Sequence, residues 1–234
     1  MEHNLKRIRL ILSCTLPLLA AAQPAHALQG GISVGGRVGT LGIGPEVAIP
    51  VGSGITVRGG AGLLGFDLDM TGRFGLADHR TARLFFPKAF YTLGADVSLG
   101  GLRAGAGLLI KSEDPTYRIT LDQGASIDIG AGTYTEPEVA TLTTGFSWAG
   151  TAPYLLLGFG SYSGRGLGFF ADVGAVILPD ASFSMTATGD DALLASQPFL
   201  DDLELEEREV RDDAGAWINY WPIVSIGLRF GLGR

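Results

Sequence analysis

Residues 220–232 read YWPIVSIGLRFGL, and apolar side chains alternate along this segment with small or polar ones. The apolar set consists of Tyr220, Pro222, Val224, Ile226, Leu228, Phe230 and Leu232. The intervening set contains Ser225, Gly227, Arg229 and Gly231. Because successive side chains of an extended chain point to opposite sides, this alternation predicts a β-strand with one apolar face and one small, polar face.

The same alternation recurs through most of the chain. Seven segments share it: residues 40–50, 55–70, 85–99, 102–111, 152–160, 167–178 and 219–232. Within residues 55–70 the apolar phase slips, which predicts a β-bulge near Leu64 and Gly65. Residues 31–38 are out of phase with the segment that follows, so either a bulge or a tight turn lies near Gly39-Thr40. A turn there makes residues 31–38 a separate strand and raises the count to eight.

The position of the glycines distinguishes a soluble β-sandwich from a membrane barrel. The chain has 36 Gly among 234 residues, and many lie on the faces opposite the apolar side chains. Gly weakens a strand without providing a solvated surface, so it is a poor choice for the outside of a soluble sandwich. In a membrane barrel the apolar face meets lipid and small or polar residues line the lumen. We therefore predict an all-β fold, a single antiparallel transmembrane β-barrel with eight strands.

The first 27 residues are typical of a secretory signal peptide. Lys6, Arg7 and Arg9 form a basic start, residues 10–22 are an apolar run, and residues 25–27 form a small-x-small cleavage site. The apolar run is too short for a spanning helix, which needs about 18–20 residues. We expect residues 1–27 to be removed and residues 28–234 to form one barrel domain.

Cys14 is the only cysteine and lies within this signal. Its position raises the possibility of a lipoprotein, but the preceding residues 11–13 match a lipid-attachment motif poorly. The mature chain is then free of cysteine and forms neither disulfides nor thiolate metal sites. After residue 27 no apolar stretch is long enough for a membrane-spanning helix, which excludes a helical membrane protein.

Negative charge is concentrated in one segment. The mature chain carries 14 Lys and Arg against 23 Asp and Glu, and ten of these acids lie within residues 190–213. A nucleic-acid partner needs a concentrated basic face, and the sequence has none, so we expect no nucleic-acid binding. Pro198, with Ser196 or Gln197 as a cap, predicts a short acidic helix here, with Phe199, Leu203 and Val210 as a partial apolar stripe.

Short and long connections alternate along the chain. Residues 52–54, 100–101 and 161–166 form short connections, whereas residues 72–84, 112–151 and 179–218 form long ones. Outer-membrane barrels have short periplasmic turns and longer extracellular loops. In the second long connection, residues 117–122 and 126–129 alternate around Gln123-Gly124 and predict a hairpin.

Two sets of side chains follow from the barrel prediction. Aromatic residues near the strand ends are expected to form an interfacial girdle: Phe85, Phe86, Trp148, Trp217, Tyr220 and Trp221. Charged residues on the inner faces are expected to pair across the lumen or to hold water: Arg37, Glu46, Arg58, Asp96, Arg103, Lys111, Asp172 and Arg229. Because side chains nearly fill an eight-stranded barrel, a wide pore is not expected.

The signal, the alternating strands and above all the segment Tyr220–Phe230 resemble the small outer-membrane β-barrels of the OmpA-like and OmpW-like superfamily. This resemblance implies a location in the bacterial outer membrane, where the partners are outer-membrane lipid and lipopolysaccharide, and a monomeric barrel. It also implies that the barrel-assembly machinery reads the last strand through Val224, Ile226, Leu228 and Phe230. The resemblance implies no reaction.

Two further functions that side chains of this sequence could support are hydrolase activity and metal binding. A hydrolase would need a nucleophile and an orienting acid, yet His79 is the one histidine of the mature chain and no serine stands out as its partner. The carboxylates of residues 190–213 can be interpreted as Ca²⁺ or Mg²⁺ ligands or as a solvated, charged loop, and their spacing does not match an EF-hand. We predict no enzyme activity and no cofactor, and leave the metal question open.

Three interpretations of the function remain open. The first is a structural or surface-interaction barrel of the cell envelope. The second is a narrow channel or binding barrel for a small molecule, apolar ones included, in which Arg58→Ala or Arg103→Ala alters ion selectivity. The third is a soluble, lipocalin-like periplasmic barrel, which would stay soluble without detergent.

Overall fold

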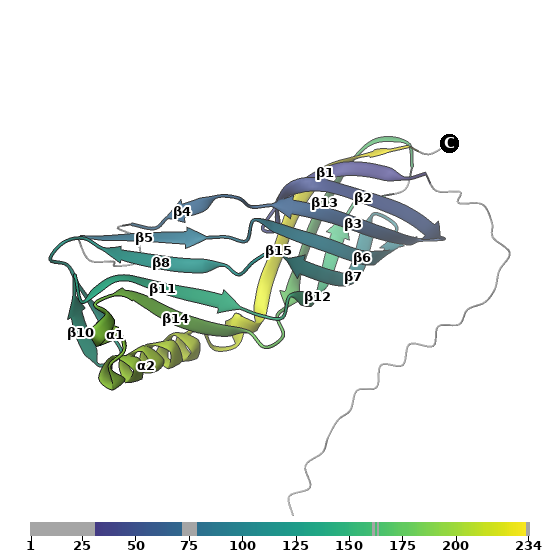
Figure 1. The fold of residues 1–234 in the computed structure, drawn as a ribbon. Coiled ribbons are helices and arrows are strands. Elements are labelled where there is room, and N and C mark those ends of the chain that lie inside the picture. Colours follow the sequence, from purple (N-terminus) through teal and green to yellow (C-terminus); the bar gives the residue numbers. More distant parts are fainter. Residues whose placement is uncertain (1–30, 72–78, 161, 163, 233–234) are drawn as a thin grey trace, which may run out of the picture.

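The chain closes into an eight-stranded antiparallel barrel, as predicted (Figure 1). The computed structural model describes residues 31–71, 79–160, 162 and 164–232, so the predicted signal lies outside the described residues. The barrel order is β1-β15-β13-β12-β7-β6-β3-β2. The strands are β1 (Ser33–Gly39), β2 (Gly42–Gly52), β3 (Ile55–Leu63), β6 (Ala89–Leu99), β7 (Leu102–Lys111), β12 (Thr151–Phe159), β13 (Gly166–Ile177) and β15 (Tyr220–Gly231).

A tight turn, and not a bulge, separates β1 from β2. Gly39 pairs with Gly42, and the positive φ of 92° at Gly42 is a conformation that favours glycine. Thr40 ties this turn to the last strand, since its hydroxyl donates to the carbonyl oxygen of Pro222 at 2.7 Å. Residues 31–38 therefore contribute a strand of their own, which completes the even number.

The predicted faces of the strands are confirmed by their exposure. On β15 the apolar set Val224, Ile226, Leu228 and Phe230 is 51–55% exposed. The intervening Ser225 and Arg229 are 7% and 8% exposed. The other barrel strands repeat the pattern, with exposed side chains such as Leu93, Leu157 and Leu167. The barrel thus turns its apolar face outward and its glycine-rich face inward.

A second antiparallel sheet extends from one end of the barrel (Figure 1). Its order is β14-β11-β8-β5-β4. The strands are β4 (Asp67–Asp69), β5 (Arg80–Phe85), β8 (Thr116–Leu121), β11 (Val139–Ser147) and β14 (Ser182–Gly189). The three long connections predicted from the sequence supply most of this sheet, so they are largely strands instead of loops.

Two predicted details of this region are wrong. The phase slip near Leu64 and Gly65 is not a bulge within one strand, because β3 ends at Leu63 and β4 continues in the second sheet. The predicted hairpin of residues 117–122 and 126–129 does not form either. β8 pairs with β5 and β11 on its two edges, whereas β9 (Ser126–Ile129) pairs with β10 (Gly132–Thr135). Both edges of β8 are occupied, so no edge is left for β9.

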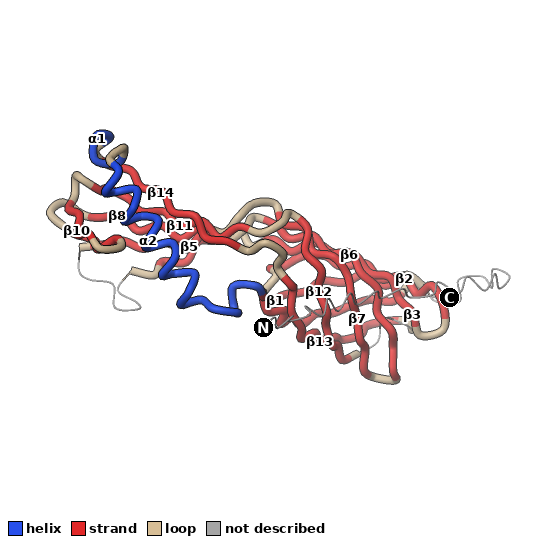
Figure 2. Tube along the Cα trace, turned by 90° about the horizontal axis from the view of Figure 1, so that it is seen from below, coloured by secondary structure: helices blue, strands red, loops and turns tan. Residues whose placement is uncertain are grey.

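The predicted acidic helix is present and packs beside β14, the edge strand of the second sheet. After a short α1 (Asp191–Leu194), α2 runs from Gln197 to Ala214, followed by a 3-10 turn over Gly215–Asn219. Ser196 is the N-cap and proline lies in the first turn. Phe199 is 2% exposed and packs with Leu142 of β11 and Tyr134 of β10 in one apolar cluster. In Figure 2 the blue helix lies along this sheet. None of the described helices is both long and apolar enough to cross a membrane.

Carboxylates of α2 accept hydrogen bonds from the β9–β10 hairpin and from β14. Asp202 accepts hydrogen bonds from the Ala131 amide at 3.2 Å and from the Tyr134 hydroxyl at 2.5 Å. Glu206 accepts one from the Gly130 amide at 2.9 Å, and Glu207 accepts one from the Met185 amide at 2.5 Å. Part of the acidic charge thus holds the helix in place, because an ionised acceptor strengthens a hydrogen bond.

Tyr134 is expected to titrate late because of this arrangement. Burial, together with the hydrogen bond to Asp202, raises the pKa of Tyr134 to about 12, against an ordinary value of about 10. The folded state favours the neutral phenol, so the stability from this group is complete below about pH 10 and is lost as the pH rises to about 12. The difference in tyrosinate absorbance between the wild type and Tyr134→Phe measures this titration. A midpoint near the ordinary value would contradict the contact with Asp202.

Candidate functional site: the barrel lumen

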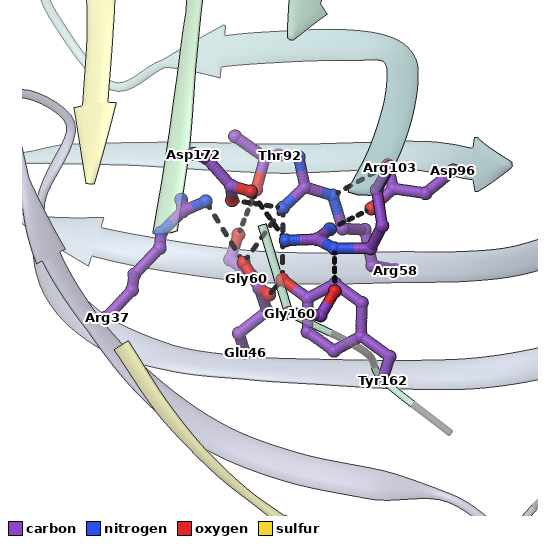
Figure 3. Close-up of polar contacts among 10 residues, drawn as sticks. All are labelled: Arg37, Glu46, Arg58, Gly60, Thr92, Asp96, Arg103, Gly160, Tyr162 and Asp172. Carbon is purple, nitrogen blue, oxygen red and sulfur yellow. Dashed lines mark hydrogen bonds and ion pairs between the residues drawn. The ribbon is translucent and has the colours of Figure 1, made fainter. Parts of the chain in front are cut away.

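Six charged side chains from six different strands meet inside the barrel (Figure 3). They are Arg37 of β1, Glu46 of β2, Arg58 of β3, Asp96 of β6, Arg103 of β7 and Asp172 of β13. Each is at most 6% exposed. All six belong to the inner faces predicted from the alternation, because a period of two places every second residue of each strand toward the lumen.

Arg103 is the most buried guanidinium of this cluster. It forms ion pairs with Asp96 and, at 2.6 Å, with Asp172. Its Nε donates to the carbonyl oxygen of Gly160 at 2.9 Å, and its guanidinium lies 4.2 Å from the ring centroid of Tyr162. Four groups therefore fix one side chain that is 1% exposed.

Arg58 joins the remaining carboxylates to the same cluster. Its NH1 lies 2.9 Å from Asp172 and 3.6 Å from Glu46, and its Nε lies 3.3 Å from Asp96. NH1 also donates to the hydroxyl of Tyr162 at 3.2 Å. Because each carboxylate touches an arginine, the desolvation cost of burying it is offset by a close opposite charge.

Tyr162 is a member of the cluster that the sequence analysis did not identify. It lies in the connection between β12 and β13, yet its side chain is 2% exposed and its hydroxyl donates to Glu46. Its ring packs against Phe170, 5.3 Å between centroids, and against Ala48. A lone aromatic in a connection of Ser, Gly and Arg was the available signal, but a connection has no periodicity that assigns a direction.

The cluster is electrically balanced, with three arginines and three carboxylates. Arg37 forms its ion pair with Glu46 at 3.4 Å, and its Nε and NH2 have no hydrogen-bond partner among the described residues. A cavity of about 10 Å³ lies beside Arg37, Arg58 and Tyr154. One water molecule needs about that much room. At this level of the barrel, side chains therefore fill nearly the whole lumen.

The other two predicted lumen charges lie apart from the cluster. Lys111, at the end of β7, pairs with Asp114, and its ammonium lies 3.8 Å from the ring centroid of Trp148. Arg229 of β15 is 8% exposed and donates to the carbonyl oxygen of Gly164 at 3.3 Å. One lies toward the second sheet and the other near the connection between β12 and β13.

Apolar side chains fill the lumen between the charged cluster and the second sheet. Phe90, Leu109, Val176 and Leu178 are at most 2% exposed and belong to one cluster with Trp148. Trp221 packs on Phe90 with 5.6 Å between ring centroids and on Trp148 with 5.9 Å. A continuous apolar layer thus closes this end of the barrel.

This layer corrects the predicted aromatic girdle. Trp148 is 6% exposed, and Phe86 and Trp221 pack against the same inner cluster, so these three do not face the outside. The alternation already assigns Trp221 to the inner face of β15, together with Ile223 and Ser225. Trp217 and Tyr220 are 84% and 47% exposed, as a girdle requires.

Phe85 also lies away from the predicted girdle. It ends β5 in the second sheet, and the guanidinium of Arg118 lies 5.2 Å from its ring centroid.

The hydrolase and metal alternatives gain no support from the described residues. His79 is exposed and has a positive φ of 68° just before β5, while the adjacent Asp78 lies outside the described residues. Within the described ranges, no three His, Cys, Asp or Glu side chains lie together as a metal site. The predicted assembly segment Val224, Ile226, Leu228 and Phe230 lies on the outer face of β15.

The fold is similar to that of solved structures from Acinetobacter baumannii. CarO of Acinetobacter baumannii matches with a TM-score of 0.57 and 18% identity over 88% of this chain and 99% of its own. CarO2 of the same organism matches with a TM-score of 0.57 and 18% identity over 86% and 98%. No protein-family model and no curated protein matches the chain. The likeness shows that this chain shares the fold of these barrels over nearly their whole length.

Proposed function

We propose that this protein is an outer-membrane β-barrel with a structural or surface-interaction role in the bacterial envelope. The observation that carries the proposal is the belt of exposed apolar side chains around a closed barrel. Leu93, Leu99, Leu157 and Leu167 are 60–75% exposed, and every barrel strand contributes to the belt. Such a continuous apolar surface is too large for a soluble monomer and matches the hydrocarbon region of a bilayer.

Strand length agrees with a membrane location. A tilted transmembrane strand needs about 9–11 residues to cross the hydrocarbon core. β2, β6 and β7 have 11, 11 and 10 residues, and β13 and β15 have 12 each. The likeness to CarO and the sequence resemblance to OmpA-like and OmpW-like barrels support the same location.

The filled lumen favours a structural role over transport. A conduit would need a continuous path past Arg58, whose ion pair with Asp172 joins opposite walls of the barrel, and past Arg103, which pairs with the same carboxylate from β7. The second sheet and α2 provide the accessible surface. They lie at the end with the long connections, which in outer-membrane barrels faces the outside. We propose contact with lipopolysaccharide at that end, insertion by the barrel-assembly machinery, and a monomer.

Electrophoresis in SDS of the membrane fraction, boiled against unboiled, tests the membrane barrel. A closed barrel resists SDS until it is heated, so we expect two different mobilities and recovery of the protein only with detergent. Protein that stays in the soluble fraction and shows one mobility would overturn the proposal and favour the lipocalin-like alternative.

Conductance separates a structural barrel from a narrow channel. In planar bilayers we expect the wild type to give no steady ion current, because charged and apolar layers fill the lumen. Arg58→Ala, once shown to be folded by its SDS mobility, serves as the comparison. A wild-type current whose cation-to-anion selectivity changes in Arg58→Ala would contradict the structural role and support the channel.

A further inference from the structure

A cavity of about 510 Å³ lies where the second sheet joins the barrel. Its size is within the range of small-molecule sites. It is lined by Gly65, Phe66, Asp67, Phe85, Phe86, Lys88, Glu113, Asp114, Thr116 and Arg118. These residues come from three of the places where the chain passes between the barrel and the second sheet, namely β3 to β4, β5 to β6 and β7 to β8.

Aromatic rings form one part of the wall. The rings of Phe66 and Phe86 lie 5.4 Å apart, and Phe66 is 50% exposed. Phe85 adds a third ring from β5. Behind them, Phe86 contacts Trp221 with 6.4 Å between centroids. This wall offers an apolar surface to a ligand and connects it to a fluorescent side chain.

Three of the cations around the cavity have a carboxylate partner, and Arg118 has none among the described residues. Lys88 pairs with Glu113 at 3.3 Å, Arg83 pairs with Asp67 at 3.2 Å, and Lys111 pairs with Asp114. Arg118 has neither an ion pair nor a hydrogen bond to another described residue, and its guanidinium lies on the ring of Phe85.

The pairing of β5 with β8 places two arginines side by side. Arg118 of β8 lies directly opposite Arg83 of β5 in the sheet. Like charges at directly opposite positions destabilise a sheet. Arg83 is already paired with Asp67, so an anion bound at Arg118 would compensate the one guanidinium of the two that has no carboxylate partner among the described residues. The donors of Arg118 are available for a carboxylate or phosphate.

We propose that this cavity binds a small amphiphilic anion, a carboxylate or phosphate monoester carried on an apolar body. Arg118 binds the anionic group, and Phe66, Phe85 and Phe86 contact the apolar body. Leu63, at the end of β3, is 57% exposed and lies two residues before the cavity-lining Gly65, so the same chemistry is available from two sources. One is an anionic lipid of the surrounding membrane, and the other is a free molecule from the solvent.

Phenylbutyrate is a suitable probe, with the full chain in nanodiscs of phosphatidylcholine. We expect saturable quenching or enhancement of tryptophan fluorescence through the contact between Phe86 and Trp221. Arg118→Gln is expected to weaken binding about tenfold or more, and Phe85→Ala to weaken it as well. Arg165→Gln, an exposed arginine in the connection between β12 and β13, is the matched control and should bind like the wild type.

The neutral phenylbutyramide tests the role of charge. It should bind the wild type about tenfold or more weakly than the acid, with no further loss in Arg118→Gln. Equal binding of acid and amide, or wild-type affinity in Arg118→Gln, would overturn the proposal, as would the absence of saturable binding of the acid.

Nanodiscs that contain phosphatidylglycerol distinguish the two sources. If the occupant is a membrane lipid, this anionic lipid competes, and phenylbutyrate binds the wild type more weakly than in phosphatidylcholine. If the occupant is a free molecule, the affinity is the same in both discs. Either result supports the site, and neither depends on whether the lumen conducts.

Discussion

Replacing Arg103 by alanine is expected to lower the free energy of unfolding by about 3–5 kcal/mol, the usual cost of removing one partner of a buried ion pair. Asp96 is 0% exposed and Asp172 is 5% exposed, and both lose their closest cation. The carbonyl oxygen of Gly160 and the ring of Tyr162 lose a contact as well. Arg58 still contacts both carboxylates, but two arginines then face three buried carboxylates, so the cluster keeps one negative charge in excess.

Equilibrium unfolding in urea, with the protein in detergent, measures this loss. Arg165→Ala removes an exposed arginine at the same end of the barrel and should change the unfolding free energy little. Adding Asp96→Asn to Arg103→Ala removes the excess negative charge, so the double variant is expected to recover part of the stability. A single variant as stable as the wild type would mean that the cluster contributes no net stabilisation.

Two adjacent glycines of β1 are expected to respond in opposite directions to valine. A Cβ at Gly35 would point into the lumen, 3.0 Å from Cα of Arg229 and closer still to the carbonyl oxygen of Leu228. The backbone of β15 cannot move away without breaking the pairing of β1, so Gly35→Val is expected to prevent closure or to cost about 1–3 kcal/mol or more. A Cβ at Gly36 would point outward, with its nearest neighbour, the carbonyl oxygen of Gly44, at 3.8 Å.

Gly36→Val should therefore be tolerated and modestly stabilising, because Gly in a strand interior costs about 0.5–1 kcal/mol relative to alanine. The fraction of heat-modifiable protein and the temperature of the mobility change compare the two variants directly. Similar behaviour of both variants would contradict the assignment of inner and outer faces in β1.

The barrel strands were predictable from sequence because their two faces lie in different environments. Lipid on one face and a narrow lumen on the other impose a period of two, and this period assigned Val224 outward and Arg58 inward without further information. It also predicted the charged residues of the cluster, since a charge is tolerated only on the inner face. Partner choice, such as Arg103 with Asp172, depends on register between strands that are distant in sequence.

The second sheet and the inner aromatic layer were harder to predict, because they too depend on contacts between segments that are distant in sequence. β8 has short alternation, but whether it pairs with β9 or with β5 and β11 depends on long-range pairing that a local pattern does not contain. Trp148 follows β11 and turns into the barrel, whereas Trp217 stays outside. Both are tryptophans near a strand end, and local sequence does not separate them.

The seam of the barrel joins its first and last strands, since β1 pairs with β15 at every position from Ser33 to Gly39. Seven strands are therefore complete before the ribosome has finished β15, yet no subset of them can close. A nonsense mutation before Tyr220 removes all 12 residues of β15. It leaves two sheet edges whose unpaired amides and carbonyls find no partner in lipid. Such a truncated product is not a smaller barrel but a substrate for envelope proteases and chaperones.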